Sequence, residues 1–161
     1  IEIHSNKYLE SQVKKIKVLA SSIKKRKEDK KNILYICEPK IIKYKNLEIN
    51  EMQMLEKSLR FLSVFKDKID NFLIRPHPSE KTSKYINLKD KNYPFNIKNS
   101  DLSEICLDIS KSDIVLGYES YGLVIALKSK KKVYTVSSFW SKDIVLPFKE
   151  ISPIEELFYD L

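Results

Sequence analysis

The sequence is poor in the residues that mark fibrous, disulfide-rich or membrane-spanning chains. It has two glycines, six prolines, two cysteines and one tryptophan in 161 residues. So little glycine and proline excludes a collagen-like or low-complexity chain. Cys37 and Cys106 lie far apart, each in an apolar segment and without CxxC or Cys/His spacing, which predicts buried free thiols and no metal site. No apolar run approaches the length of a transmembrane helix, so we expect a cytoplasmic globular domain.

Several catalytic and cofactor motifs are also missing. The sequence contains no HExxH and no GxSxG, and its only imidazoles are His4 and His77. Gly117 and Gly122 do not form the glycine pair of a dinucleotide fingerprint, and no Lys-Ser/Thr pair follows Gly122 to complete a P-loop. We therefore expect neither a self-contained hydrolase nor a nicotinamide-dependent oxidoreductase, and no cofactor.

The chain carries a formal net charge of +8, nearly all of it from lysines. These lysines are scattered among isoleucines and asparagines, and do not form the clustered basic face with exposed aromatic residues that nucleic-acid binders use. The charge therefore predicts no nucleic-acid partner. It suits an anionic small molecule or peripheral contact with an acidic membrane surface.

Apolar runs and helical periodicity alternate along most of the chain. Residues 32–37, 71–75, 113–116 and 133–136 are short apolar runs, as expected for strands buried on both faces. Helical spacing separates them over 50–65, with Asn50 as N-cap, over 101–109, with Asp101 as N-cap, and over 121–127. This pattern predicts an α/β fold, a Rossmann-like parallel sheet with helices on both faces, over residues 32–161.

The flanking segments give weaker signals. Residues 1–31 are expected to form an N-terminal segment and a lysine-rich linker, with strands at 1–4 and 16–20 and a helix beginning near Ser5. The pattern at 93–97 fits either a short strand or a loop, and 154–159 fits a short closing helix. Because the chain begins with Ile1, we also expect it to have been cut from a longer protein.

Polar side chains follow the predicted strands, at the edge where parallel sheets bind ligands. Prolines on either side of His77 would hold its imidazole, and Arg75 beside it, rigidly next to an anionic phosphate. The alternative is that His77 caps a neighbouring helix and Arg75 pairs with a surface carboxylate. Glu38 follows the first of these strands, and Ser137 and Ser138, which are also common turn formers, follow the last.

A third loop carries both glycines of the chain. Gly117 and Gly122 bracket a strand-to-helix turn in which Ser120 would hold a phosphate at the helix N-terminus, and Glu119 would accept hydrogen bonds from sugar hydroxyls. Ser120 equally fits a simple helix cap, with the glycines permitting tight packing.

These loops resemble the C-terminal, nucleotide-sugar-binding domain of GT-B glycosyltransferases. The resemblance rests on LIRPHP at 73–78, followed by DIVLGYES at 113–120, and is nearest to bacterial surface-polysaccharide and sialyltransferase-like enzymes. It implies that His77 and Pro78 bind the donor nucleotide and its phosphate, with His77 catalytic, and that Ser120 supports the phosphate. Glu119 stands where the sialyltransferases often carry a hydroxyl residue.

The resemblance also implies partners outside the chain. A nucleotide sugar would be the donor, and a surface glycan or lipid-linked sugar the acceptor. An N-terminal GT-B half would supply the catalytic base. Two other interpretations stay open: a nucleotide-sugar epimerase or polyol-phosphate transferase on a similar fold, and a non-catalytic binding or scaffold module.

Overall fold

The protein is a Rossmann-like α/β domain built on one parallel sheet. The computed structural model describes residues 6–23, 29–141 and 146–161. Among these residues, six strands form a sheet in the order β5-β4-β1-β6-β7-β8, and β2 and β3 form a separate antiparallel hairpin. Counting only the strands of the large sheet, this is the order 3-2-1-4-5-6 of doubly wound folds. The predicted fold class is confirmed.

The elements of the described residues follow one another as helix, strand and short 3₁₀ segments, the last labelled η. They are α1 Lys7–Ser22, β1 Lys31–Ile36, β2 Ile41–Tyr44, β3 Leu47–Asn50, α2 Glu51–Leu62, η1 Ser63–Lys68, β4 Ile69–Arg75, η2 Thr82–Leu88, β5 Asn96–Asn99, α3 Ile105–Lys111, β6 Ile114–Gly117, α4 Tyr121–Lys128, β7 Lys132–Thr135, η3 Ser137–Phe139, β8 Ser152–Pro153 and η4 Ile154–Asp160.

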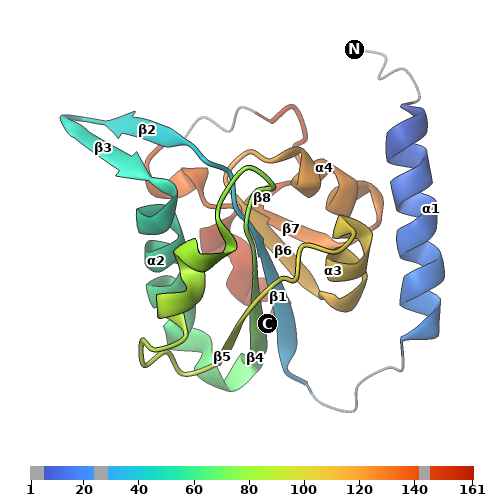
Figure 1. Ribbon diagram of the computed structural model, residues 1–161, viewed down its shortest axis with the longest axis horizontal. Helices are drawn as coiled ribbons and strands as arrows, with labels where there is room; N and C mark the ends of the chain where they lie inside the picture. The colour runs from blue at the N-terminus through green and yellow to red at the C-terminus, as the bar shows by residue number, and fades with distance from the viewer. Residues whose placement is uncertain (1–5, 24–28, 142–145) are drawn as a thin grey trace.

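The sheet lies between two layers, with α2 on one side and α3 and α4 on the other (Figure 1). Alternate residues of β1 serve the two layers: Tyr35 packs in the core under α2, whereas Leu34 and Ile36 pack under α3 and α4. This is why β1 appears in the sequence as an unbroken apolar run.

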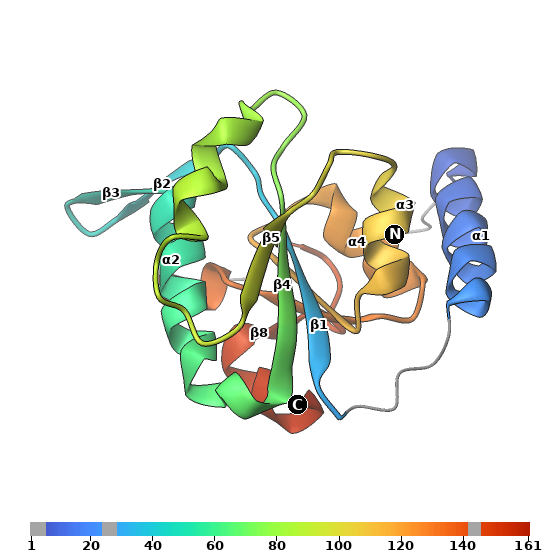
Figure 2. The same cartoon turned by 60° about the horizontal axis from the view of Figure 1, so that its bottom comes forward.

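Helix α1 forms an outer layer on α3 and α4, as both views show (Figures 1 and 2). Its Ile16 is 1% exposed and belongs to the core between the sheet and these helices. Asn6 caps the helix by accepting hydrogen bonds from the backbone amides of Tyr8 and Leu9. Residues 7–22 therefore pack as part of the same body as the sheet.

Several predicted elements differ from the observed ones. The strand predicted at 16–20 is wrong, because α1 runs through it as one helix. The third helix begins at Ile105 and not after Asp101, because Leu102 has a positive φ of 58° and the Asp101 carboxylate accepts a hydrogen bond from the Ser103 amide. The strand predicted at 1–4 and the start near Ser5 lie outside the described residues.

Other expectations are confirmed. Asn50 caps α2 in a capping box with Gln53, each side chain accepting from the other residue's backbone amide. The open segment at 93–97 contributes to β5, and the predicted closing helix is the 3₁₀ segment η4. The hairpin of β2 and β3, which projects from the body in Figure 1, has no counterpart among the predicted elements.

The two glycines provide space and not unusual backbone angles, because neither has a positive φ. A Cβ on Gly117 would lie 3.0 Å from the carbonyl oxygen of Ile36 in the neighbouring strand. A Cβ on Gly122 would lie 2.7 Å from Cδ1 of Ile36 and 3.1 Å from Cδ1 of Ile105. A side chain at either position would therefore force β1 or a neighbouring side chain to shift, so the two glycines let the turn between β6 and α4 lie close against β1.

Replacing Gly122 by valine should destabilise the fold. Gly122→Val forces extra methyl groups against Ile36 and Ile105, and we expect the free energy of unfolding to fall by about 1–3 kcal/mol. Urea denaturation followed by circular dichroism measures it. As a control, Ala20→Val at an exposed position of α1 should cost less than about 1 kcal/mol. Equal effects of the two changes would contradict close packing at Gly122.

Candidate functional site

The strand register brings the three predicted loops to one edge of the sheet. Ile36, the last residue of β1, is level with Arg75 at the end of β4 and with Gly117 at the end of β6. The segments that follow these residues therefore leave the sheet side by side at its carboxyl edge. Strand β1 lies between β4 and β6. The strands that follow β1 in the chain are added first on one side of it, as β4 and β5, and then on the other, as β6 to β8. Doubly wound folds bind ligands at this switch point.

A lysine that was not among the predicted residues joins two of these loops. Lys40, in the segment after β1, forms an ion pair with Glu119, at 2.7 Å between Nζ and Oε2. The same ammonium lies 4.8 Å from the centre of the Tyr118 ring. The hydrogen bond to Glu119 raises the pKa of Lys40, so the lysine stays charged. The Glu119 carboxylate, which was predicted to accept hydrogen bonds from sugar hydroxyls, therefore already accepts one from Lys40.

The loop after β4 holds His77 in a defined orientation. Pro76 is buried and Pro78 exposed, and between them the His77 ring is exposed to solvent. Its Nδ1 accepts a hydrogen bond from the Ser79 amide at 3.2 Å and lies 2.7 Å from the Ser79 hydroxyl. Because Nδ1 accepts from a backbone amide, the neutral imidazole carries its proton on Nε2. His77 can therefore present an N–H donor from Nε2.

Glu80 fastens this loop to the core. Its carboxylate accepts hydrogen bonds from the His77 amide at 3.1 Å and from the Tyr85 hydroxyl at 3.0 Å, and it pairs with Lys84. Burial works to raise the pKa of Glu80, but the bonds from Lys84, the His77 amide and Tyr85 outweigh it and lower the pKa. Glu80 is therefore held ionised as the anchor of the His77 loop.

Ser120 is the N-cap of α4. Its hydroxyl oxygen accepts a hydrogen bond from the Gly122 amide at 3.1 Å, as the structural alternative predicted. The hydroxyl proton is not used by that bond, so Ser120 can still donate to a ligand at the helix N-terminus. Gly117, at the end of β6, is buried and contributes space to this turn.

Arg75 does not lie with His77, although only Pro76 separates them. Its guanidinium forms a buried ion pair with Asp108 of α3 and donates to the Ser103 carbonyl at 2.8 Å. Ser100 completes the cluster by donating to Asp108 at 2.7 Å. The predicted phosphate contact from Arg75 is thus replaced by a link between β4 and α3, because the side chain turns to the α3 face of the sheet.

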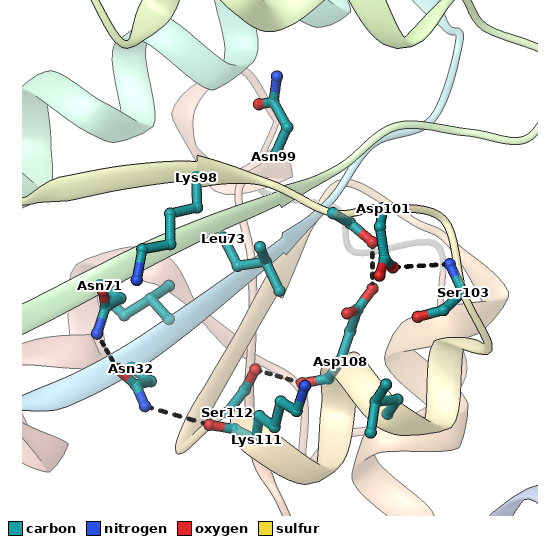
Figure 3. A pocket seen from close by; sticks show the side chains of 13 residues that line it. Asn32, Asn71, Leu73, Lys98, Asn99, Asp101, Ser103, Asp108, Lys111 and Ser112 are labelled. Carbon is teal, nitrogen blue, oxygen red and sulfur yellow. Dashed lines mark hydrogen bonds between the residues drawn. The ribbon is translucent and has the colours of Figure 1, made fainter.

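A hollow of about 330 Å³ lies beside this cluster, between α3 and the exposed face of β4 and β5 (Figure 3). Three asparagines form a hydrogen-bonded row across neighbouring strands: Asn96 donates to Asn71 at 3.0 Å, and Asn71 donates to Asn32 at 2.9 Å. The hollow follows the sheet face, away from the loops at the carboxyl edge, and contains none of the residues predicted from the strand-end loops.

The serines after β7 serve the protein itself. Ser137 is fully buried, 2.9 Å from the Thr135 hydroxyl, and Ser138 donates to the Glu155 carboxylate at 2.6 Å. Both hydroxyls, which were predicted to reach a ligand, therefore already have protein partners.

A buried glutamate at the carboxyl edge was also missed. Glu51, the first residue of α2, is 2% exposed, and its Oε2 accepts a hydrogen bond from the Glu38 amide at 3.1 Å. Within the described residues, no group donates to Glu51 Oε1 or to Glu38 Oε2, which are both buried. Burial raises the pKa of Glu51 to about 7. A polar residue straight after an N-cap looks like a solvated first turn, so the sequence gives no sign of this burial.

Glu51 lines a cavity of about 320 Å³ at this edge. The wall is formed by Pro39, Lys40, Ile41, Asn50, Glu51, Met52 and Lys84. Lys84 ties this cavity to the His77 loop through Glu80, and Lys40 ties it to the β6 loop through Glu119. Ion pairs therefore link two lysines of the cavity wall to the predicted loops, although none of the predicted site residues lines the cavity itself.

Comparison with known proteins adds no relative: no protein-family model, curated protein or solved structure matches the chain. Among the helices of residues 6–23, 29–141 and 146–161, none is long and apolar enough to cross a membrane. The same residues contain no group of three or more His, Cys, Asp or Glu side chains placed to hold a metal ion.

Removing the negative partner of Arg75 should be costly. Asp108→Asn leaves a buried guanidinium without its counter-charge, and we expect the free energy of unfolding to fall by about 3 kcal/mol in urea denaturation. Asp67→Asn, at an exposed position, should change it by less than about 0.5 kcal/mol. A similarly small effect of Asp108→Asn would show that the pair does not hold β4 to α3.

Glu51 should make the stability depend on pH. Its pKa is higher in the folded chain than its ordinary value of 4.5, so its contribution is fully present below about pH 4.5 and is lost as the pH rises through about 7. Glu51→Gln cannot ionise, and it should be more stable than the parent by about 3 kcal/mol at pH 8 and nearly equal at pH 4.5. Urea denaturation across this pH range measures the difference. A difference independent of pH would refute this account of Glu51.

Proposed function

We propose that this domain binds a nucleotide-activated sugar through its phosphates at the carboxyl edge of the sheet, as the donor-binding half of a GT-B glycosyltransferase. The observation that carries the proposal is the meeting of the His77 loop, the Lys40 segment and the Ser120 turn at the point where the sheet order reverses. The LIRPHP and DIVLGYES segments that suggested this family supply two of those three loops.

Each group has a distinct part in the proposed chemistry. Lys40 and Lys84 offset the negative charge of the phosphates, and Ser120 donates its hydroxyl at the N-terminus of α4. His77 presents Nε2–H toward the phosphate oxygen that accumulates charge as the sugar leaves.

Arg75 has a supporting part in this proposal. By joining β4 to α3 beneath the loop, the Arg75–Asp108 pair fixes the strand end from which His77 projects. The general base that activates the acceptor would come from a second domain, because Glu80, whose carboxylate accepts from the His77 amide, is already held by Tyr85 and Lys84. The acceptor would be a glycan or lipid-linked sugar, which places the reaction in the cytoplasm at the inner membrane surface.

The test is nucleotide binding by the chain itself. We expect at least one of CMP, CDP, UDP and GDP to raise the melting temperature and to bind in calorimetry. His77→Ala should weaken that binding by about tenfold, because it removes a hydrogen bond to a charged phosphate.

Lys81→Ala is the matched control, since Lys81 is an exposed cation of the same loop. It should leave the affinity within about twofold of the parent. Binding of no nucleotide, or equal affinity in the His77→Ala variant, would reject the donor-domain proposal and favour a non-catalytic binding module.

A further inference from the structure

The two lysines that line the cavity at the carboxyl edge are already paired with carboxylates, and a glutamate lines the cavity beside them. Lys40 and Lys84 both line it, yet each already pairs with a carboxylate, Glu119 and Glu80 respectively. Glu51 is a third acidic group at this cavity, and one of its oxygens is buried without a donor among the described residues. With Glu51 ionised, an arriving phosphate therefore meets a site in which both lysine charges are already neutralised.

The Glu51 carboxyl is buried among groups from several elements, so little water reaches it. Tyr35 approaches from β1, Cys37 and the Glu38 amide from the segment after β1, and Glu80 and Lys84 from the His77 loop and η2. Burial raises the pKa of Glu51 most, the bond from the Glu38 amide and the nearby Tyr35 hydroxyl lower it, Glu80 raises it and Lys84 lowers it. The result, about 7, leaves Glu51 able to gain or lose its proton near neutral pH.

A second negative charge in this cavity changes that balance in one direction. A phosphate held by Lys40 or Lys84 must share those ammonium groups with Glu119 or Glu80, and it repels an ionised Glu51, whose burial limits screening by water. Protonation relieves this repulsion, since the neutral carboxyl carries no charge and gains an O–H that can donate to a phosphate oxygen.

We propose that binding of a phosphate-bearing ligand in this cavity is accompanied by uptake of one proton from solvent by the Glu51 carboxylate. This inference rests on the proposed function, because it concerns the same site and the same anionic ligand. It makes the site one that binds phosphate more tightly at slightly acidic pH. Loss of the proton above neutral pH then favours release of the ligand.

The expected size follows from linkage. If the ligand raises the proton affinity of Glu51 by about tenfold, binding should be about fivefold weaker at pH 8 than at pH 6. The terminal phosphate of the ligand also changes charge in this range. Contributions from groups other than Glu51 remain when Glu51 is changed, so the difference between parent and variant isolates Glu51.

The first arm of the experiment is calorimetry with the tightest binder among CMP, CDP, UDP and GDP, at pH 6 and pH 8. Buffers with different heats of protonation report the number of protons taken up. At pH 8 the parent chain should take up about 0.4 of a proton per ligand bound, and its affinity should fall about fivefold between the two pH values beyond any fall in Glu51→Gln. Glu48→Gln, an exposed carboxylate of the neighbouring β3, is the matched control and should behave as the parent.

The second arm uses inorganic sulfate, a dianion that does not titrate in this range, and follows the Glu51 carboxyl carbon by NMR, assigned by its absence in Glu51→Gln. The titration midpoint should lie near pH 7 and should rise when sulfate is added. Equal pH dependence of nucleotide affinity in the parent and Glu51→Gln would overturn the inference while leaving nucleotide binding intact. A midpoint near the ordinary value of 4.5, or one unmoved by bound sulfate, would overturn it too.

Failure of every nucleotide and of sulfate to bind would overturn both the proposed function and this inference. Glu51→Gln has the shape of the protonated residue, and its melting curve shows whether it folds. Should it not fold, Tyr35→Phe removes the hydroxyl that lowers the pKa of Glu51. That variant should move the proton uptake to higher pH, and an unchanged profile would count against the inference.

Discussion

The close contact between β1 and the turn before α4 is the constraint on which the rest of the molecule depends. Strand β1 pairs with β4 on one side and β6 on the other, and its residues are buried on both faces. Ile36 at its end contacts both glycine positions, through its carbonyl at Gly117 and its side chain at Gly122. Because this strand end cannot shift without disturbing two strands and a helix, the loops that leave it are fixed relative to one another.

The end of β4 illustrates how such a fixed frame divides one short motif between two tasks. Arg75 is the last residue of the strand and turns into the layer of α3, where Asp108 neutralises it. Pro76 cannot continue the strand's hydrogen bonding, and His77 beyond it is exposed at the edge, with Glu80 holding its amide. One residue of the motif thus secures the strand, and the other is free to contact a ligand.

Much of the fold follows from periodicity, and much of the site does not. Continuous apolar runs identified β1, β4, β6 and β7, and helical spacing with Asn50 as cap identified α2, because both patterns record burial directly. The edge of the sheet was likewise predictable, since parallel strands end together. The hairpin of β2 and β3 was missed because its four-residue strands alternate only weakly in burial, and Asp101 was mistaken for a cap because a positive φ at Leu102 leaves no local sign.

The site residues that the sequence missed are those defined by long-range pairing. Lys40 and Glu119 are 79 positions apart, and only the fold shows that they neutralise each other. Arg75 was assigned to a phosphate for the same reason, because nothing local reveals the carboxylate of Asp108 at 33 positions' distance. The position of a residue at a strand end shows that it lies near the edge of the sheet. It does not show whether its side chain is already paired with another residue of the protein.

The same pairing limits what the net charge of +8 can mean. At the carboxyl edge the lysines do not form a positive patch, because Lys40 and Lys84 each have a carboxylate partner. An anion at this edge would therefore have to compete with a carboxylate for each ammonium group. Such a site would bind a simple anion weakly and would favour one that also contacts His77 and Ser120. The selectivity of this edge would thus come from the ion pairs of Lys40 and Lys84, which a ligand must disrupt, and not from the excess of lysine over the whole chain.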